Sequence, residues 1–238
     1  MAKIGICDWG IGGLGVYKEL RKRGSNADIV YFSDSGYTPY GKVPKDELHE
    51  RWLKVKSFFE DEEVDQIIVA CNALSTVVQE QGPIVIIATA VRRVVEDNRN
   101  QAVGIIGGIR TIESGIYDLG YGHLGSVAQP LSALVESGII VGAEVEETIR
   151  NVVEPISSSE LIVLACTHYP VLIPVFRKLY PTKLFIDPVN NLFEKVSFPM
   201  DGNCKADFHT SGNIKEMESS AEKVWGLQLK NVRNSIQN

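Results

Sequence analysis

The chain has 238 residues, 44% of them hydrophobic and 23% charged, which suits one large or two small globular domains with a real core. Its net charge is −6, from 24 basic and 30 acidic side chains, so we expect neither nucleic acid nor a membrane surface as a partner. The first residues lack a signal peptide's apolar run and cleavage site, and no stretch approaches the ~20 apolar residues of a membrane span. These features predict a cytoplasmic protein.

The predicted elements alternate along the chain between strand and helix. Short apolar, β-branched runs predict strands at 3–7, 28–32, 66–70, 84–87, 103–106, 161–165 and 183–186. Helical patterns lie between them at 14–23, about 45–60, 89–97, 143–154 and 171–180. Runs that are apolar on successive residues are typical of strands buried on both faces of a parallel sheet. The sequence therefore predicts an α/β fold.

A weak internal duplication runs through the chain. The segment 3–13 resembles 102–111, because each has a strand, a Gly-rich turn and a helix start. The segments IIVACNALS and VLACTHYP share an apolar run that ends in Ala-Cys. Ile4 and Val103 are 99 positions apart, and Cys71 and Cys166 are 95 apart. We therefore expect two similar open α/β lobes with mainly parallel sheets and a cleft between them, where ligands bind outside the carboxyl ends of strands.

Cysteine usage points to thiol chemistry rather than to disulfides or metal. The four cysteines form no CxxC pair and the four histidines are scattered, which argues against a disulfide framework and a zinc site. Either Cys71 or Cys166, taken alone, reads as a buried structural residue. As a pair at matching strand ends they fit a racemase, in which one group removes a proton from one face of a carbon and another returns one to the opposite face. Cys7 is expected in the core and Cys204 on the surface.

Each thiol has a polar neighbour that can serve as its proton partner. Asp8 ends the first strand, and His168 lies two residues beyond Cys166. Donors for a substrate carboxylate are also present, as backbone N–H groups or polar side chains, at Gly12, Gly13, Tyr40, Gly41, Asn72 and Ser75.

An ordered set of motifs makes the chain resemble the glutamate racemase family and, more widely, the cofactor-independent aspartate/glutamate racemases. The set covers nearly the whole chain: IGICDWGIGGLGVYKEL, YFSDSGYTPYG, VACNALS, GGIRTIESGIY, QPLSALVESG, LACTHYPVL, IDPVNNLFEKV and ADFHTSGN. The resemblance implies an isomerase, a racemase with no metal and no other cofactor that acts on an acidic amino acid as its small-molecule substrate. It implies a homodimer, and D-glutamate for peptidoglycan synthesis and thus for cell shape.

The resemblance also implies a role for individual residues. Cys71 and Cys166 would be the two acid/base thiols, with Asp8 assisting the first and His168, supported by Glu136, assisting the second. The substrate would be held by Trp9, Pro39, Tyr40, Gly41, Asn72, Ala73, Thr111 and Thr167. The first lobe would comprise 1–88 and 198–238, and the second 89–197.

Four positions depart from the family pattern. Trp9 and Ala73 replace a serine and a threonine, while Gln129 and Pro188 replace a cysteine and a serine. A site that loses hydroxyls and gains an indole leaves two substrates open, glutamate first and aspartate second. A related dicarboxylate isomerase or decarboxylase, and an inactive amino-acid-binding protein, remain as weaker alternatives.

Overall fold

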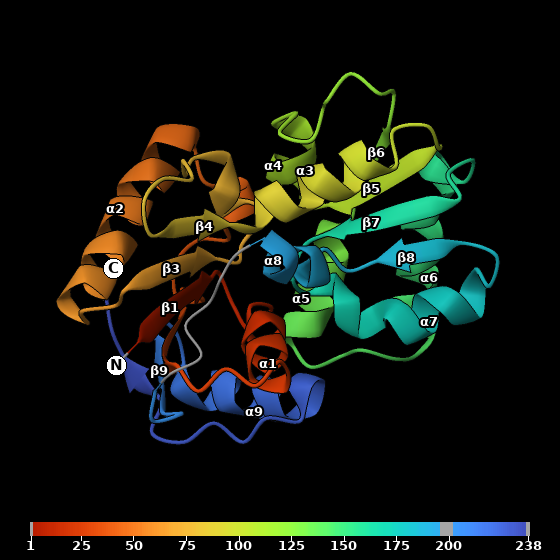
Figure 1. The fold of residues 1–238 in the computed structure, drawn as a ribbon. Coiled ribbons are helices and arrows are strands. Elements are labelled where there is room, and N and C mark those ends of the chain that lie inside the picture. Colours follow the sequence, from red (N-terminus) through yellow and green to blue (C-terminus); the bar gives the residue numbers. More distant parts are fainter. Residues whose placement is uncertain (1, 196–201, 237–238) are drawn as a thin grey trace.

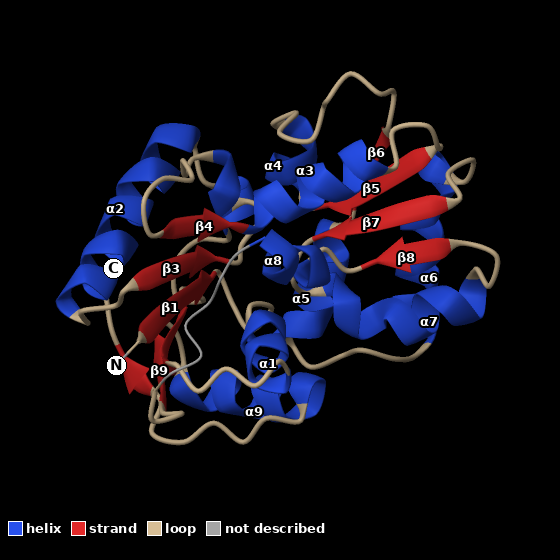
Figure 2. Ribbon diagram, in the orientation of Figure 1, coloured by secondary structure: helices blue, strands red, loops and turns tan. Residues whose placement is uncertain are grey.

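The computed structural model has two parallel β-sheets that lie side by side, each covered by helices (Figures 1 and 2). The structure describes residues 2–195 and 202–236. The strands are β1 (Lys3–Asp8), β2 (Asp28–Ser33), β3 (Gln66–Val69), β4 (Ile84–Ile86), β5 (Val103–Gly107), β6 (Leu124–Val127), β7 (Leu161–Ala165), β8 (Leu184–Ile186), β9 (Ala206–Thr210) and β10 (Arg233–Asn234). The helices are α1 (Leu14–Lys22), α2 (Lys45–Asp61), α3 (Ile87–Asp97), α4 (Ile109–Glu113), α5 (Gln129–Glu136), α6 (Ala143–Val153), α7 (Ile173–Leu179), α8 (Val189–Lys195) and α9 (Ile214–Trp225).

The two sheets repeat one strand order, which confirms the prediction of two similar lobes. The first sheet runs β10-β9-β2-β1-β3-β4 and the second β6-β5-β7-β8. In each, the opening strand (β1 or β5) lies between the second and the third, and the fourth lies outside the third. All of these pairings are parallel. Cys71 and Cys166 therefore follow equivalent strands, β3 and β7, as the duplication predicts.

Strand β1 shows why the buried runs fold as they do. Alternate side chains point to opposite faces, so Ile4 and Ile6 pack in the cluster that includes α1, while Cys7 packs with residues of α2. Only a glycine leaves room at position 5, because the Phe59 ring of α2 lies 2.6 Å from where the Cβ of a larger residue would stand. Figure 1 shows α2 beside one face of this sheet and α1 and α9 beside the other. Apolar burial on both faces stabilises the sheet.

Helix α3 joins the two lobes through a shared core. Its residue Ala90 packs with first-sheet residues such as Ile68. Val91, one residue on, belongs to a second cluster that holds both Val69 of β3 and Val163 of β7. The helix thus contributes to packing against both sheets, and this contact fixes how their carboxyl ends face each other.

Most predicted strands are confirmed to within two residues, but three strands escaped prediction. Edge strand β6 is exposed at three of its four positions. Strand β9 begins with two half-buried residues, Ala206 and Asp207, and β10 is only two residues long. None of them has the apolar run that marks a doubly buried strand. Strands β9 and β10 extend the first sheet. The lobe boundary at 88 stays a prediction, and the one at 198 lies outside the described residues.

Helices α4, α5, α8 and α9 had no assigned range in the sequence prediction. Three of them, α4, α5 and α8, have only five to eight residues, too few to show helical periodicity. Helix α9 is longer, and Asn213 caps it by accepting from the backbone N–H groups of Lys215 and Glu216. In the described part of the chain, no helix has the length and apolar character to cross a membrane.

Candidate active site

A pocket of about 50 Å³ lies between the two lobes, at the carboxyl ends of their strands. Twelve of the thirteen predicted site residues line it: Asp8, Trp9, Pro39, Tyr40, Gly41, Cys71, Asn72, Ala73, Thr111, Cys166, Thr167 and His168. Glu136, the thirteenth, stands behind His168. Gly12, Gly13 and Ser75 are not part of the wall. The Ser75 hydroxyl instead donates to the backbone oxygen of Cys71, 2.9 Å away.

One side of the pocket carries a chain of three acid/base groups. The Sγ of Cys166 lies 3.7 Å from Nδ1 of His168, whose Nε2 lies 2.7 Å from Oε2 of Glu136. A carboxylate only accepts, so Glu136 keeps a proton on Nε2 and leaves Nδ1 as the nitrogen that exchanges a proton with the thiol. The same Oε2 accepts from the backbone N–H of Ile11, 3.0 Å away in the Gly-rich turn of the other lobe.

This chain of contacts favours the charged imidazolium of His168. Burial by itself would lower the pKa of His168. Its hydrogen bonds to Cys166 and Glu136, together with their negative charges, outweigh burial and raise the pKa well above the ordinary value.

The other side of the pocket carries Cys71 in a different environment. Burial, followed by the negative charge of Asp8, raises the pKa of the Cys71 thiol well above its ordinary value. Backbone N–H groups of Leu74 and Ala73, at the start of the turn after the cysteine, act in the opposite direction. These donors can hold a transient thiolate. Cys71 therefore favours its protonated form at rest.

Asp8 is buried at the end of β1 and has a partner on each oxygen. Its Oδ1 accepts from the backbone N–H of Trp9 at 2.8 Å, and its Oδ2 accepts from the Thr167 hydroxyl at 2.7 Å. Burial raises the pKa of Asp8, although the charge of His168 and the bond from Thr167 oppose that rise. The Asp8 carboxyl is thus poised to hold or release a proton beside Cys71.

Asn72 offers the pocket an unused donor. Its Oδ1 accepts a hydrogen bond from the hydroxyl of Tyr117, whereas its Nδ2 has no partner among the residues that the structure describes. The side chain is only 3% exposed, so an unpaired amide is costly unless a ligand accepts from it. Tyr117 was not among the predicted site residues, although its position in the GGIRTIESGIY motif could have indicated a role at the site.

Trp9 and Tyr40 form part of the wall with their polar groups already engaged. The indole Nε1 of Trp9 donates to the backbone oxygen of Tyr37 at 3.0 Å, and the Tyr40 hydroxyl donates to Asp34 at 2.5 Å. Both rings therefore present apolar surface to the cavity. Trp9 lies at the pocket and not wholly in the core.

Four wall residues were absent from the predicted site: Gly108, Gln129, Ser132 and Ala165. Gln129 Nε2 donates to the Ser132 hydroxyl at 3.0 Å, and its Oε1 lies 2.9 Å from where a Cβ of Gly41 would stand. The departure of Gln129 from the family pattern was a usable signal, while Ser132 had none. In the described residues, no group of three or more His, Cys, Asp and Glu side chains could hold a metal ion.

Two lobes of one topology, each ending a strand in a thiol at a shared pocket, define the class of protein as a two-lobed α/β protein with a paired-thiol site. No protein-family model matches the chain. A glutamate racemase of Exiguobacterium sibiricum is 30% identical over 92% of this chain and 90% of its own length. A glutamate racemase of Shouchella clausii is 33% identical over 82% of this chain and 76% of its own.

The solved structures agree with these relatives. The glutamate racemase of Thermus thermophilus, in complex with β-chloro-D-alanine, superposes with a TM-score of 0.89, at 25% identity, over 98% of this chain and 96% of that one. The chain belongs to the glutamate racemase family.

Proposed function

We propose that the chain interconverts L- and D-glutamate by proton transfer between two thiols, with no cofactor. One observation carries this proposal. Equivalent strands of two equivalent lobes, β3 and β7, deliver Cys71 and Cys166 to one pocket. A carbon bound between groups from opposite lobes can lose a proton to one and gain a proton from the other, which inverts it.

The two environments suggest which thiol acts as base in one direction. Sγ of Cys166 lies 3.7 Å from Nδ1 of His168, a partner for proton exchange, while burial and the charge of Asp8 raise the pKa of Cys71 and favour its protonated form. In that direction Cys166 takes the α-proton, and Cys71 donates its proton to the opposite face. The reverse direction exchanges these roles, and Asp8 and His168 restore the two starting protonation states. No bond other than C–H, S–H and the helpers' O–H or N–H bonds is made or broken.

The carboxylates of the substrate would be held by donors in the same wall. The Nδ2 of Asn72 has no acceptor among the described residues, so it can donate to a substrate carboxylate. Thr111 is also buried and lines the same cavity. Donors aimed at the α-carboxylate also stabilise the negative charge that develops as the α-proton leaves. Thr167 contributes by holding Asp8, since its hydroxyl is already donated.

Aspartate is the second candidate substrate, and the apolar face of Trp9 is the observation that favours it. An indole where a serine is expected narrows the pocket and removes a hydroxyl. The narrower pocket suits the aspartate side chain, which is shorter than that of glutamate by one methylene. A pocket separates substrates that differ by one methylene by only about 1–3 kcal/mol, so both substrates belong in the assay.

We further infer that the enzyme is a cytoplasmic homodimer whose D-glutamate serves peptidoglycan synthesis and cell shape. This setting rests on the family resemblance, and sedimentation of the purified chain checks the dimer.

The test is deuterium incorporation at the α-carbon of each enantiomer of glutamate and aspartate in D₂O. We expect both hands of one substrate to exchange and to racemise, read by NMR and circular dichroism. Cys71→Ala/Cys166→Ala should lose both, whereas Cys204→Ala, which changes an exposed thiol, should match the unaltered chain. Exchange in the double variant at the rate of the unaltered chain would rule out the two-thiol reaction. Tight binding without exchange in the unaltered chain would favour a binding protein.

A further inference from the structure

A buried ion pair lies next to the pocket and has no part in the proton transfers. Arg51 of α2 and Asp34, the residue after β2, have side chains exposed by only 1% and 0%. The guanidinium binds the carboxylate through two hydrogen bonds, from Nε to Oδ2 at 2.8 Å and from Nη2 to Oδ1. Such paired bonds fix the carboxylate in one orientation.

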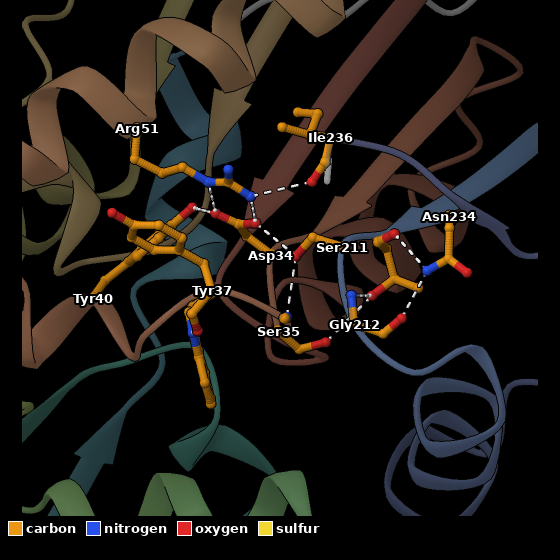
Figure 3. A network of polar contacts seen from close by, with 12 residues as sticks. Asp34, Ser35, Tyr37, Tyr40, Arg51, Ser211, Gly212, Asn234 and Ile236 are labelled. Carbon is orange, nitrogen blue, oxygen red and sulfur yellow. Dashed lines mark hydrogen bonds and ion pairs between the residues drawn. The ribbon is translucent and has the colours of Figure 1, made fainter. Parts of the chain in front are cut away.

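Figure 3 shows that other segments converge on this pair. The hydroxyls of Tyr40 and Ser211 both donate to Asp34, at 2.5 Å and 2.7 Å. The guanidinium lies 4.5 Å from the ring centre of Tyr37. Its Nη2 also lies 3.4 Å from the backbone oxygen of Ile236, near the chain's end. The pair thus connects α2, the segment after β2 and the C-terminal strands.

Two of these contacts lead into the pocket. Tyr40 lines it directly, and its phenol is fixed by Asp34. Trp9 also lines it, and its indole N–H is held by the backbone oxygen of Tyr37, whose ring stacks on Arg51. The two aromatic walls of the pocket are therefore attached to the same ion pair by independent routes.

Stability does not account for this arrangement. Removing two charges from water costs about as much as a buried pair returns, so such a pair is weak support for a folded state. The Nη1 of Arg51 adds to the cost, because it has no hydrogen-bond partner among the described residues. The geometry, by contrast, is specific, since a planar fork and a stacked ring restrict where Tyr37 and Tyr40 can lie.

We propose that the Arg51–Asp34 ion pair is a positioning unit that sets the Trp9 and Tyr40 walls of the pocket and so determines which acidic amino acid fits. The inference rests on the proposed racemase activity. A hydrogen bond from the other lobe also restrains the segment that carries Tyr40: Nε of Arg110 donates to the backbone oxygen of Tyr40 at 2.9 Å. The wall is thus held from both sides of the cleft.

The test compares Arg51→Lys and Tyr37→Leu with the unaltered chain, using KM and kcat for glutamate and aspartate. Lysine keeps the charge but loses the fork and the stacking. Leucine keeps the backbone oxygen that holds Trp9 but loses the stacked ring, together with the hydroxyl that donates to Glu47 at 2.7 Å. We expect KM for the preferred substrate to rise roughly tenfold in Arg51→Lys, about the effect of one lost hydrogen bond, and less in Tyr37→Leu. The kcat should change less than KM, and the glutamate-to-aspartate ratio of kcat/KM should shift.

Ser126→Ala is the matched control for lost stability. It removes a buried hydroxyl that donates to the Val152 backbone oxygen at 2.6 Å; Ser126 does not line the pocket, so the change should leave KM and the substrate ratio unchanged. Folded variants with unaltered KM and ratio would overturn the inference. If Arg51→Lys does not fold, Tyr37→Leu decides, because Tyr37 is half-buried and packs against the core cluster without being one of its buried members. Failure of the unaltered chain to exchange either substrate would instead reject the proposed function.

Discussion

The Thr167 hydroxyl donates a 2.7 Å hydrogen bond to Oδ2 of Asp8, which joins the second lobe to the first at the pocket itself. Thr167 sits between Cys166 and His168, so the bond links the acid/base groups of one lobe to the carboxyl group beside Cys71. A second bond crosses nearby, from the Ile11 N–H to Glu136. The two halves of the site are therefore held in register by polar contacts between lobes as well as by the shared core.

Removing the Thr167 hydroxyl should weaken both stability and activity. Thr167→Val keeps the shape but leaves a buried carboxylate oxygen without its donor, so we expect the free energy of unfolding to fall by about 1–3 kcal/mol in urea titrations. The racemisation rate should fall with it, because Asp8 loses a fixed orientation. Thr167→Ser keeps the hydroxyl and should recover most of both; equal losses in the two variants would mean that the hydrogen bond is not the cause.

Replacing Glu136 by glutamine should shift the pH profile. The Glu136 charge is one of the effects that raise the pKa of His168, so Glu136→Gln lowers that pKa. The alkaline limb of kcat/KM, where the imidazolium loses its proton, should move to lower pH. At the optimum kcat/KM should fall roughly tenfold, the cost of one charge-assisted hydrogen bond. Glu146→Gln, at an exposed glutamate paired with Lys178, is the control and should leave the profile in place; an unmoved limb in Glu136→Gln would contradict the assignment.

Asp8→Asn should trade activity for stability. Because burial raises the pKa of Asp8 in the folded state, the folded chain keeps this proton to higher pH than the unfolded chain. The resulting contribution to stability is complete below the unfolded pKa of about 3.9 and is lost as the pH rises through the folded pKa. An amide has no charge to bury, so the variant should gain roughly 0.5–2 kcal/mol over the unaltered chain, increasingly at higher pH.

The same Asp8→Asn variant should lose racemisation by about a hundredfold or more, since it removes a proton partner of Cys71. Thermal unfolding at several pH values, together with the exchange assay, measures both effects. A variant that is less stable at pH 8 than the unaltered chain would contradict the raised pKa.

Gly12→Ala should disable the site by displacing it. A Cβ at this position would stand 2.5 Å from Oγ1 of Thr167, 2.6 Å from Nδ1 of His168 and 2.8 Å from Oδ2 of Asp8. All three side chains must move, and a displacement near 1 Å can cost about a hundredfold in rate. Gly115→Ala is the control, because its positive φ of 65° strains the backbone while its Cβ meets nothing. It should lower the unfolding midpoint and keep the exchange rate, and equal activity in the two variants would refute the clash.

Local pattern was enough to predict the elements that have a strong periodic signal. The apolar runs of β1, β3, β5 and β7 are buried along their lengths, and their composition reports that burial directly. It also marked Asp8 at the end of β1 and the wall residues Cys71, Asn72, Cys166 and His168 that follow β3 and β7, whereas Thr111 and Thr167 were implied by the family resemblance. Strand β6 was not predicted, because an exposed edge strand has no apolar run, whereas the apolar run of its neighbour β5 predicts that strand clearly.

The sequence by itself determined the repeated α/β pattern, the placement of Cys71 and Cys166 after equivalent strands, and the ordered motifs that resemble those of the glutamate racemase family. The family resemblance already implied that Glu136 supports His168, and the tertiary structure alone decided that Thr167 meets Asp8 and that Arg51 meets Asp34. The reason is physical. Burial and periodicity depend on neighbours along the chain, whereas each of these bonds joins residues from different elements, and its geometry exists only once those elements have packed together.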